Sequence, residues 1–220
     1  MEYIDCINRC LENARTPQGK ILMEKMRSDV QWYRENFQDD PQRLSGWGHQ
    51  YFCADDGAFL QFSRTSPRGH RCPICGKVYD ADNYNSAWVY LYRYEALMSA
   101  LEAAALYRLE GGEHYLEHFR RIVGFYSDHY DEFEVHGKGP TTSFASSESE
   151  CEKIFNEMIK TVNGLEMLKG YLPEEFVQGV CQNLLLPGAR FVNAKKKIIH
   201  NIPCWINSAV GTVGLYTGDE

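Results

Sequence analysis

Two short turns that contain cysteine constrain this chain more than any other feature. The first is Cys53-Ala-Asp-Asp56-Gly57, and the second is Cys72-Pro-Ile-Cys75-Gly76. In each turn a glycine follows the second candidate ligand, where it allows the backbone to fold beneath a metal ion. Tetrahedral zinc needs four thiolate, imidazole or carboxylate ligands, and paired turns of this kind supply them. The sequence therefore predicts a structural zinc site.

The fourth ligand of this site has two candidates. Cys53, Cys72 and Cys75 supply three thiolates. Asp56 preserves the symmetry of the two turns, whereas His70 offers the imidazole that zinc favours. The competing interpretation is a set of free or buried thiols in a reducing compartment. If the protein fills all four positions, no water is activated, so we expect the site to organise the fold without catalysing a reaction.

Charge and cysteine usage exclude several classes of partner. A net charge of −7 argues against a dedicated nucleic-acid binder, because only the run Lys195-Lys196-Lys197 opposes phosphate repulsion, and we interpret that run as a solvated helix face. The N-terminal sequence lacks the pattern of a signal peptide, and the chain has no apolar run long enough for a membrane span. Eight cysteines in such a chain are typical of thiols and metal ligands. We expect a cytoplasmic protein.

Hydrophobic periodicity predicts helices on both sides of the cysteine turns. A helix is expected from Pro17 to the Asp39-Asp40-Pro41 stop. Beyond the turns, a helix capped at Asn85-Ser86 should run to Gly111-Gly112 and pack antiparallel to a helix through Tyr115 and Tyr126. Further helices are expected at 148–169 and from Pro173 to a stop at Pro187-Gly188.

These elements predict a mainly α fold. We expect an incomplete (α/α) toroid of antiparallel helix pairs with a small zinc-knuckle insertion. The segments are N-terminal helices at 1–43, a zinc-knuckle loop or ribbon at 44–82, and a partial toroid at 83–220. No strict repeat is visible, which argues against a regular solenoid.

Several segments together resemble bacterial proteins of the heparinase II/III family. They are Trp47-Gly-His-Gln-Tyr-Phe-Cys53, His70-Arg-Cys-Pro-Ile-Cys-Gly76, the aromatic helix from Trp88, Tyr126-Ser-Asp-His-Tyr130 with Glu134-Val-His-Gly137, and His200-Asn-Ile-Pro-Cys-Trp-Ile-Asn-Ser-Ala-Val-Gly211. The resemblance implies a polysaccharide lyase that cleaves uronic-acid-containing glycans, such as heparan sulfate or alginate, by β-elimination. It also implies an (α/α) toroid followed by a β-sandwich.

The resemblance assigns roles to particular residues. Asn201 is the candidate that neutralises the uronate carboxylate, with His200 beside it as a second candidate, and Trp205 would line the groove. Trp88 and Tyr92 are candidate stacking platforms for sugar rings. The competing interpretations are a helix cap for Asn201, an ordinary histidine for His200, and core packing for the aromatic rings.

An acidic glycan requires cations on the protein, and Arg64, Arg68 and Arg71 near the zinc loop are the candidates. Two alternatives to a lyase use the same segments. One is a non-catalytic glycan-binding module, and the other is a zinc-stabilised domain that binds a protein partner.

The family's catalytic Tyr and His, and its β-sandwich, would follow Glu220. We therefore expect the 220-residue chain to be catalytically weak or inactive by itself. We also expect that apolar helix faces near that end allow a homodimer to form.

Overall fold

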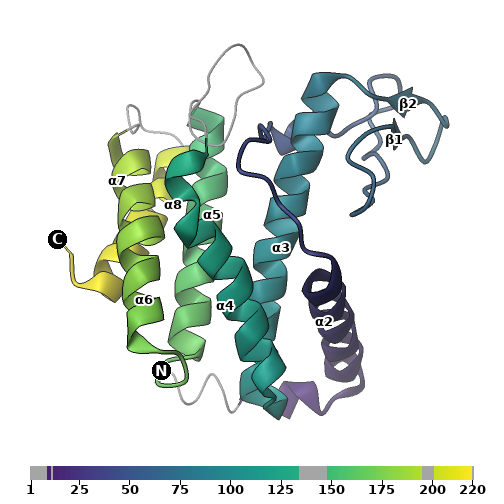
Figure 1. Cartoon of the computed structure of the whole chain (residues 1–220). Coiled ribbons are helices and arrows are strands. Elements are labelled where there is room, and N and C mark those ends of the chain that lie inside the picture. Colours follow the sequence, from purple (N-terminus) through teal and green to yellow (C-terminus); the bar gives the residue numbers. More distant parts are fainter. Residues whose placement is uncertain (1–8, 11, 134–147, 195–200, 220) are drawn as a thin grey trace.

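The computed structural model describes residues 9–10, 12–133, 148–194 and 201–219, and its architecture is mainly helical (Figure 1). The helices are α2 (Pro17–Asn36), α3 (Asp82–Glu110), α4 (Glu113–Asp128), α5 (Glu148–Met167), α6 (Glu174–Val180), α7 (Leu186–Ala194) and α8 (Asn201–Thr217). Short helical turns are η1 (Gly48–Gln50), η2 (Tyr130–Glu132) and the π-helical η3 (Cys181–Leu185). The two strands, β1 (His70–Arg71) and β2 (Val78–Tyr79), pair antiparallel.

The helices stand side by side, and α3 lies at the centre of the packing. It contacts α2 on one side, and α4 and α5 on the other, while α8 packs against α5 and α7. Gly111 and Gly112 join α3 to α4 with positive φ angles of 75° and 107°, which glycine adopts readily. The antiparallel pairing of α3 with α4 is therefore confirmed (Figure 1).

Helix α2 forms where its periodicity predicts it. Thr16 caps the helix by accepting a hydrogen bond of 3.0 Å from the Gly19 N–H, and Pro17 occupies the first turn. Its apolar stripe buries Val30 and Tyr33, and Phe37 follows at the end of the helix. Phe37 and Tyr92 stack with centroids 6.4 Å apart, which fixes α2 against α3.

Helix α3 starts three residues before the predicted cap. It begins at Asp82, and Asn85 and Ser86 lie inside its first turns. Their side chains bond elsewhere: Asn85 Nδ2 donates to Asp80 O at 3.1 Å, and Ser86 Oγ donates to Asn83 O at 3.2 Å. Asn and Ser favour caps, but here both side chains bond to backbone carbonyls three or five residues earlier from positions inside the helix.

The predicted stop at Pro187-Gly188 is wrong, because the helix continues through Pro187 to Ala194. The turn before the proline widens into the π-helical η3, where Leu186 N–H donates to Cys181 O, five residues back. A proline in a regular helix clashes with the carbonyl four residues earlier, and a π-turn relieves this clash. Helices α6 and α7 therefore form one rod with a local bulge.

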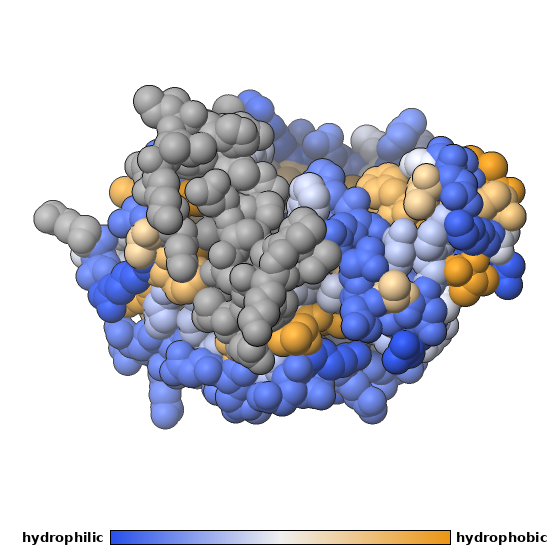
Figure 2. All heavy atoms as spheres, turned by 90° about the horizontal axis from the view of Figure 1, so that it is seen from above, coloured by the Kyte–Doolittle hydropathy of each residue, from blue (hydrophilic) through white to orange (hydrophobic). Residues whose placement is uncertain are grey.

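The knuckle segment, residues 51–80, projects from the start of α3 (Figure 1). Strands β1 and β2 form one hairpin, and an isolated bridge between Phe52 and Phe59 forms the other. The side chains of Phe52, Phe59, Ile74 and Val78 in this segment are exposed. Figure 2 shows hydrophobic surface, in orange, on the side of the molecule where the knuckle segment lies. Among the described residues, no helix is long and apolar enough to cross a membrane.

A buried carboxyl on α3 makes stability depend on pH. Glu102 Oε2 is buried without a hydrogen-bond partner among the described residues, and burial, with Asp29 nearby, raises the Glu102 pKa to about 7. Between about pH 4.5 and 7 the unfolded chain releases this proton while the folded chain keeps it, so the free energy of unfolding falls as pH rises. Glu102→Gln, which mimics the protonated form, should raise the melting temperature at pH 8 and leave it unchanged at pH 4.

The control for this prediction is Glu175→Gln, at an exposed position on α6. It should leave both melting temperatures unchanged. An equal rise at pH 4 and pH 8 for Glu102→Gln would contradict the role of its ionisation.

Candidate metal centre

The two cysteine turns adopt the same backbone conformation. Gly57 N–H donates to Cys53 O at 2.9 Å, and Gly76 N–H donates to Cys72 O at 3.1 Å. Gly57 and Gly76 have φ angles of 71° and 74°, a region that side chains with a Cβ rarely adopt. Each turn thus reverses the chain beneath its first cysteine, as the sequence predicts.

These turns bring Cys53, Asp56, Cys72 and Cys75 together, with their ligand atoms all within 4.8 Å of one another. Cys53 Sγ lies 3.6 Å from Cys75 Sγ, and Cys72 Sγ lies 3.3 Å from Asp56 Oδ2. A tetrahedron with metal–sulfur bonds of about 2.3 Å has sulfur–sulfur edges of about 3.8 Å. The four side chains are therefore spaced to hold a metal ion.

Backbone and side-chain donors surround the sulfur atoms. The N–H groups of Ile74 and Cys75 point at Cys72 Sγ, at 3.3 and 3.5 Å. Tyr79 Oη lies 3.0 Å from Cys53 Sγ and also accepts a hydrogen bond from Ala54 N–H. Such contacts orient metal ligands and stabilise thiolates. The sequence singled out the ligands but not Tyr79, which only the strand pairing brings beside Cys53.

The short distances between the candidate ligands shift their pKa values. The Ala58 N–H donates to Asp56 and holds the Asp56 pKa at about 2, so this ligand is a carboxylate. The Lys77 backbone N–H acts to lower the Cys75 pKa, but burial and the neighbouring ligands raise it to about 12. A cation bound among these groups would relieve their mutual repulsion and displace the thiol proton.

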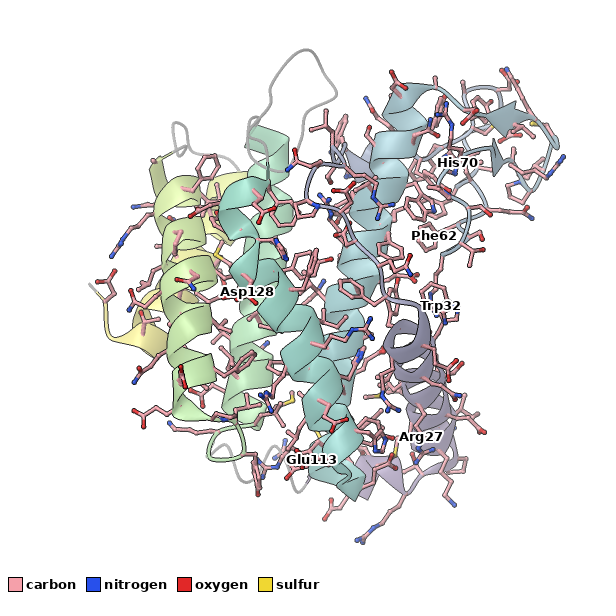
Figure 3. The ribbon with its side chains drawn as sticks, in the orientation of Figure 1. Arg27, Trp32, Phe62, His70, Glu113 and Asp128 are labelled. Atoms are coloured by element: carbon pink, nitrogen blue, oxygen red, sulfur yellow. The ribbon has the colours of Figure 1, made fainter. Side chains whose placement is uncertain are left out.

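His70 lies outside the cluster. Its Nε2 is 3.0 Å from Asn85 Oδ1, and its Nδ1 is 2.7 Å from Tyr51 Oη. Because the Asn85 amide nitrogen donates to Asp80 O, Oδ1 is the acceptor and His70 Nε2 carries the proton. Burial lowers the His70 pKa, which keeps the ring neutral. His70 therefore fastens the knuckle segment to the start of α3, on the side of the hairpin that faces the helix (Figure 3).

The three arginines near the knuckle segment do not form one patch. Arg64 bridges Asp29 at 2.6 Å and Glu95 at 2.7 Å, and its guanidinium lies over the rings of Trp32 and Tyr33. Arg71 donates to Gly76 O at 2.9 Å, within its own turn. Arg68 pairs with Asp80 at 3.0 Å and remains exposed. Arg64 thus joins α2 to α3, whereas Arg68 and Arg71 are exposed and each engages one side-chain nitrogen among the described residues.

Trp88 and Tyr92 pack in the core, with exposures of 2% and 3%. Trp88 Nε1 donates to Ser63 O at 2.7 Å, and Tyr92 Oη accepts from Gln38 N–H at 3.0 Å. Their rings stack on each other with centroids 5.2 Å apart. Both polar tips therefore anchor loops to α3, and the ring faces are covered by protein rather than open to a sugar.

The residues of the Asn201 motif lie at the start of α8. This helix begins at Asn201, and Trp205 on its first turns is half exposed. His200 and the run 195–197 lie outside the described residues. In Figure 1, α3, α5 and α8 all begin at the same end of the bundle, called the upper end below. The knuckle segment lies at this end as well.

A buried ion pair that sequence reasoning missed fixes residues 37–47 across α3. Arg93 Nε donates to Asp39 Oδ2 at 2.8 Å, and both side chains are 0–1% exposed. Arg93 also donates to the carbonyls of Asp40 and Arg43, each at 2.9 Å, and Tyr126 Oη donates to Asp39. The sequence did contain a signal for this pair, because Arg93 falls on the apolar face of its helix. A buried arginine is rare unless it has a partner of opposite charge.

A scan against protein-family models returns no match for this chain, and no curated protein matches it.

Proposed function

We propose that this chain is the zinc-clasped helical part of a polysaccharide lyase that acts on uronic-acid-containing glycans. The observation that supports the proposal is that the knuckle segment, which carries the metal cluster, and the start of α8, where Asn201 lies, are both at the upper end, on opposite sides of the helix bundle (Figure 1). These features occur in the order that the heparinase II/III resemblance implies, and the antiparallel helix pairs are compatible with part of an (α/α) toroid.

Zinc is the metal that the donor set favours. Three thiolates are soft ligands, and zinc also accepts the harder carboxylate oxygen; the four lie in a compact arrangement, and all of them come from the protein. Such a closed site activates no water. Its contribution is to fold residues 51–80 and hold them against α3.

The reaction makes separate demands on the enzyme. A base takes the C5 proton of the uronate, the C4–O4 bond breaks, a proton reaches the departing O4, and a C4–C5 double bond remains. The carboxylate at C5 must be neutralised for its α-proton to become acidic. We assign that role to the amide of Asn201, supported by the positive end of α8, whose first turn contains no acidic residue.

Asn201→Ala tests this assignment. Titration with a glucuronate-containing hexasaccharide should show about tenfold weaker binding than wild type at an unchanged melting temperature, because a hydrogen bond to a charged group is lost. Asn207→Ala, at an exposed position one and a half turns further along α8, is the matched control and should bind as wild type does. A lower melting temperature with unchanged affinity would instead identify Asn201 as a helix cap.

One observation favours a second function, a zinc-stabilised domain that binds a protein. The knuckle segment exposes Ile74 at 73%, and its exposed Phe52 and Phe59 contact each other with ring centroids 5.2 Å apart. Exposed apolar side chains that gather together are typical of interfaces. The variant Ile74→Ser distinguishes the two functions. It should leave the affinity for the hexasaccharide unchanged if the chain is a glycan-binding part of a lyase.

A further inference from the structure

We propose that a hollow beside the start of α3 binds one acidic group of the glycan, a carboxylate or a sulfate ester. The hollow has a volume of about 590 Å³, which lies within the usual range for small-ligand sites. The residues that line it are Arg43, Leu44, Pro67, Arg68, Asp82, Asn83, Asn85, Ser86 and Val89. This inference rests on the proposed function for the identity of the ligand, whereas the hollow itself is a feature of the fold.

Arg43 presents a guanidinium that is already held in place. Its Nη2 donates to Gln38 O and to Asp39 Oδ1, each at 3.2 Å. Its plane lies near the rings of Trp88 and Tyr92, with centroid distances of 5.8 and 5.9 Å. Nε is buried, whereas Nη1 has no hydrogen-bond partner among the described residues and is the donor left for a ligand. A fixed arginine with an unused donor loses little conformational entropy when an anion binds.

Arg68 supplies the second cation from a different segment. Only its Nε is engaged among the described residues, at 3.0 Å from Asp80. The terminal nitrogens therefore remain available, and guanidinium groups bind carboxylate and sulfate oxygens in a bidentate manner. Arg43 and Arg68 are thus 25 residues apart in the sequence but line the same hollow.

The remaining lining residues indicate a sugar rather than a free inorganic anion. Leu44, Pro67 and Val89 offer apolar surface that suits the C–H face of a ring. The Asn83 side chain has no hydrogen-bond partner among the described residues, so it can bond to a hydroxyl of the ligand. Asp82 also lines the hollow, and its carboxylate opposes a highly charged anion. Two cations and one carboxylate favour a ligand with one negative group among neutral hydroxyls.

The position of the hollow agrees with this role. Its lining residues come from positions 43–44, from the knuckle segment and from the first turns of α3. The start of α3 lies at the upper end, where α8 also begins (Figure 1). His70 and Asn85, 3.0 Å apart, tie the knuckle segment to this part of α3. The metal cluster therefore has a consequence for binding, because it shapes the loop that carries Arg68.

The test titrates sodium glucuronate into the zinc-loaded full chain. Binding is monitored through the backbone amide signals in NMR spectra. Saturable shifts are expected for Asn83 and Ser86. Arg68→Gln should weaken binding about tenfold, since it removes a charged hydrogen bond at an exposed position that the fold does not need. Asp82→Asn should tighten binding, because it removes the opposing carboxylate.

Arg71→Gln is the matched control, because it removes the same charge from the knuckle segment but does not line the hollow. It should bind as wild type does. Equal losses for Arg68→Gln and Arg71→Gln, or no response at Asn83 and Ser86, would overturn the proposal. If Arg68→Gln weakens binding while Asn201→Ala has no effect on the hexasaccharide, the hollow stands as an acid-binding site and the lyase role of Asn201 fails separately.

Discussion

Asp56→Ala is expected to strip zinc from the protein, whereas His70→Ala is expected to retain one equivalent. Asp56 is a member of the four-residue cluster, and His70 instead bonds to Tyr51 and Asn85. Loss of a ligand should weaken zinc binding by more than the roughly 10–100-fold typical of supporting residues. The measurement is zinc content after equilibration with a competing chelator, together with the melting temperature.

His70→Ala should still destabilise the chain, by about 1–3 kcal/mol, because the buried Tyr51 and the partly buried Asn85 lose their hydrogen bonds. Asp55→Ala is the matched control for Asp56→Ala: Asp55 is the adjacent carboxylate, and it pairs with Lys77 on the surface. It should keep its zinc. Retention of zinc by Asp56→Ala with loss from His70→Ala would show that the ligand set is wrong.

Asp39→Ala should produce the largest loss of stability among substitutions outside the metal cluster. It leaves the Arg93 guanidinium buried without its carboxylate and removes the acceptor of Tyr126. Breaking a buried ion pair from one side costs about 3–5 kcal/mol. Urea denaturation with zinc bound measures the change in the free energy of unfolding.

The comparison for this prediction is Asp219→Ala, which breaks the surface pair with Arg190. Exposed pairs contribute about 0–1 kcal/mol, so this variant should unfold almost as wild type does. If Asp39→Ala cost no more than Asp219→Ala, the buried pair would not be what fixes residues 37–47 to α3.

Local patterns predicted the parts of the structure that local interactions determine. Each cysteine turn is built from five consecutive residues, so spacing and the following glycine were enough to identify Cys53, Cys72 and Cys75. Helix α2 and the α3–α4 hairpin followed from apolar periodicity and from Gly111-Gly112.

The choice between Asp56 and His70 depended on a contact that the sequence does not encode locally. His70 is two residues from a ligand, but its partners Tyr51 and Asn85 come from segments on either side. The same reason explains Arg64, whose partners Asp29 and Glu95 lie on α2 and α3. Sequence reasoning could name these side chains, but only the packing of α2 against α3 assigns their roles.

Pro187 shows a second way in which prediction from local sequence fails. A proline after an amphipathic stretch usually ends a helix, yet η3 absorbs it by shifting one hydrogen bond to Cys181 O. The apolar residues Leu185, Leu186 and Val192 on this rod are buried, and their burial favours continuation over termination. Tertiary packing thus overrode a local stop.

We propose that this helical chain, with zinc bound at its cysteine turns, binds acidic glycans through their carboxylates. The decisive measurement is calorimetric titration of the zinc-loaded chain with a glucuronate-containing hexasaccharide and, in parallel, with the same hexasaccharide after its carboxyl groups are reduced to alcohols. We expect the reduced sugar to bind at least about tenfold more weakly, and added salt to weaken binding of the acidic sugar. Equal affinity for both sugars, or no binding of either, would show that the carboxylates are not what the chain recognises.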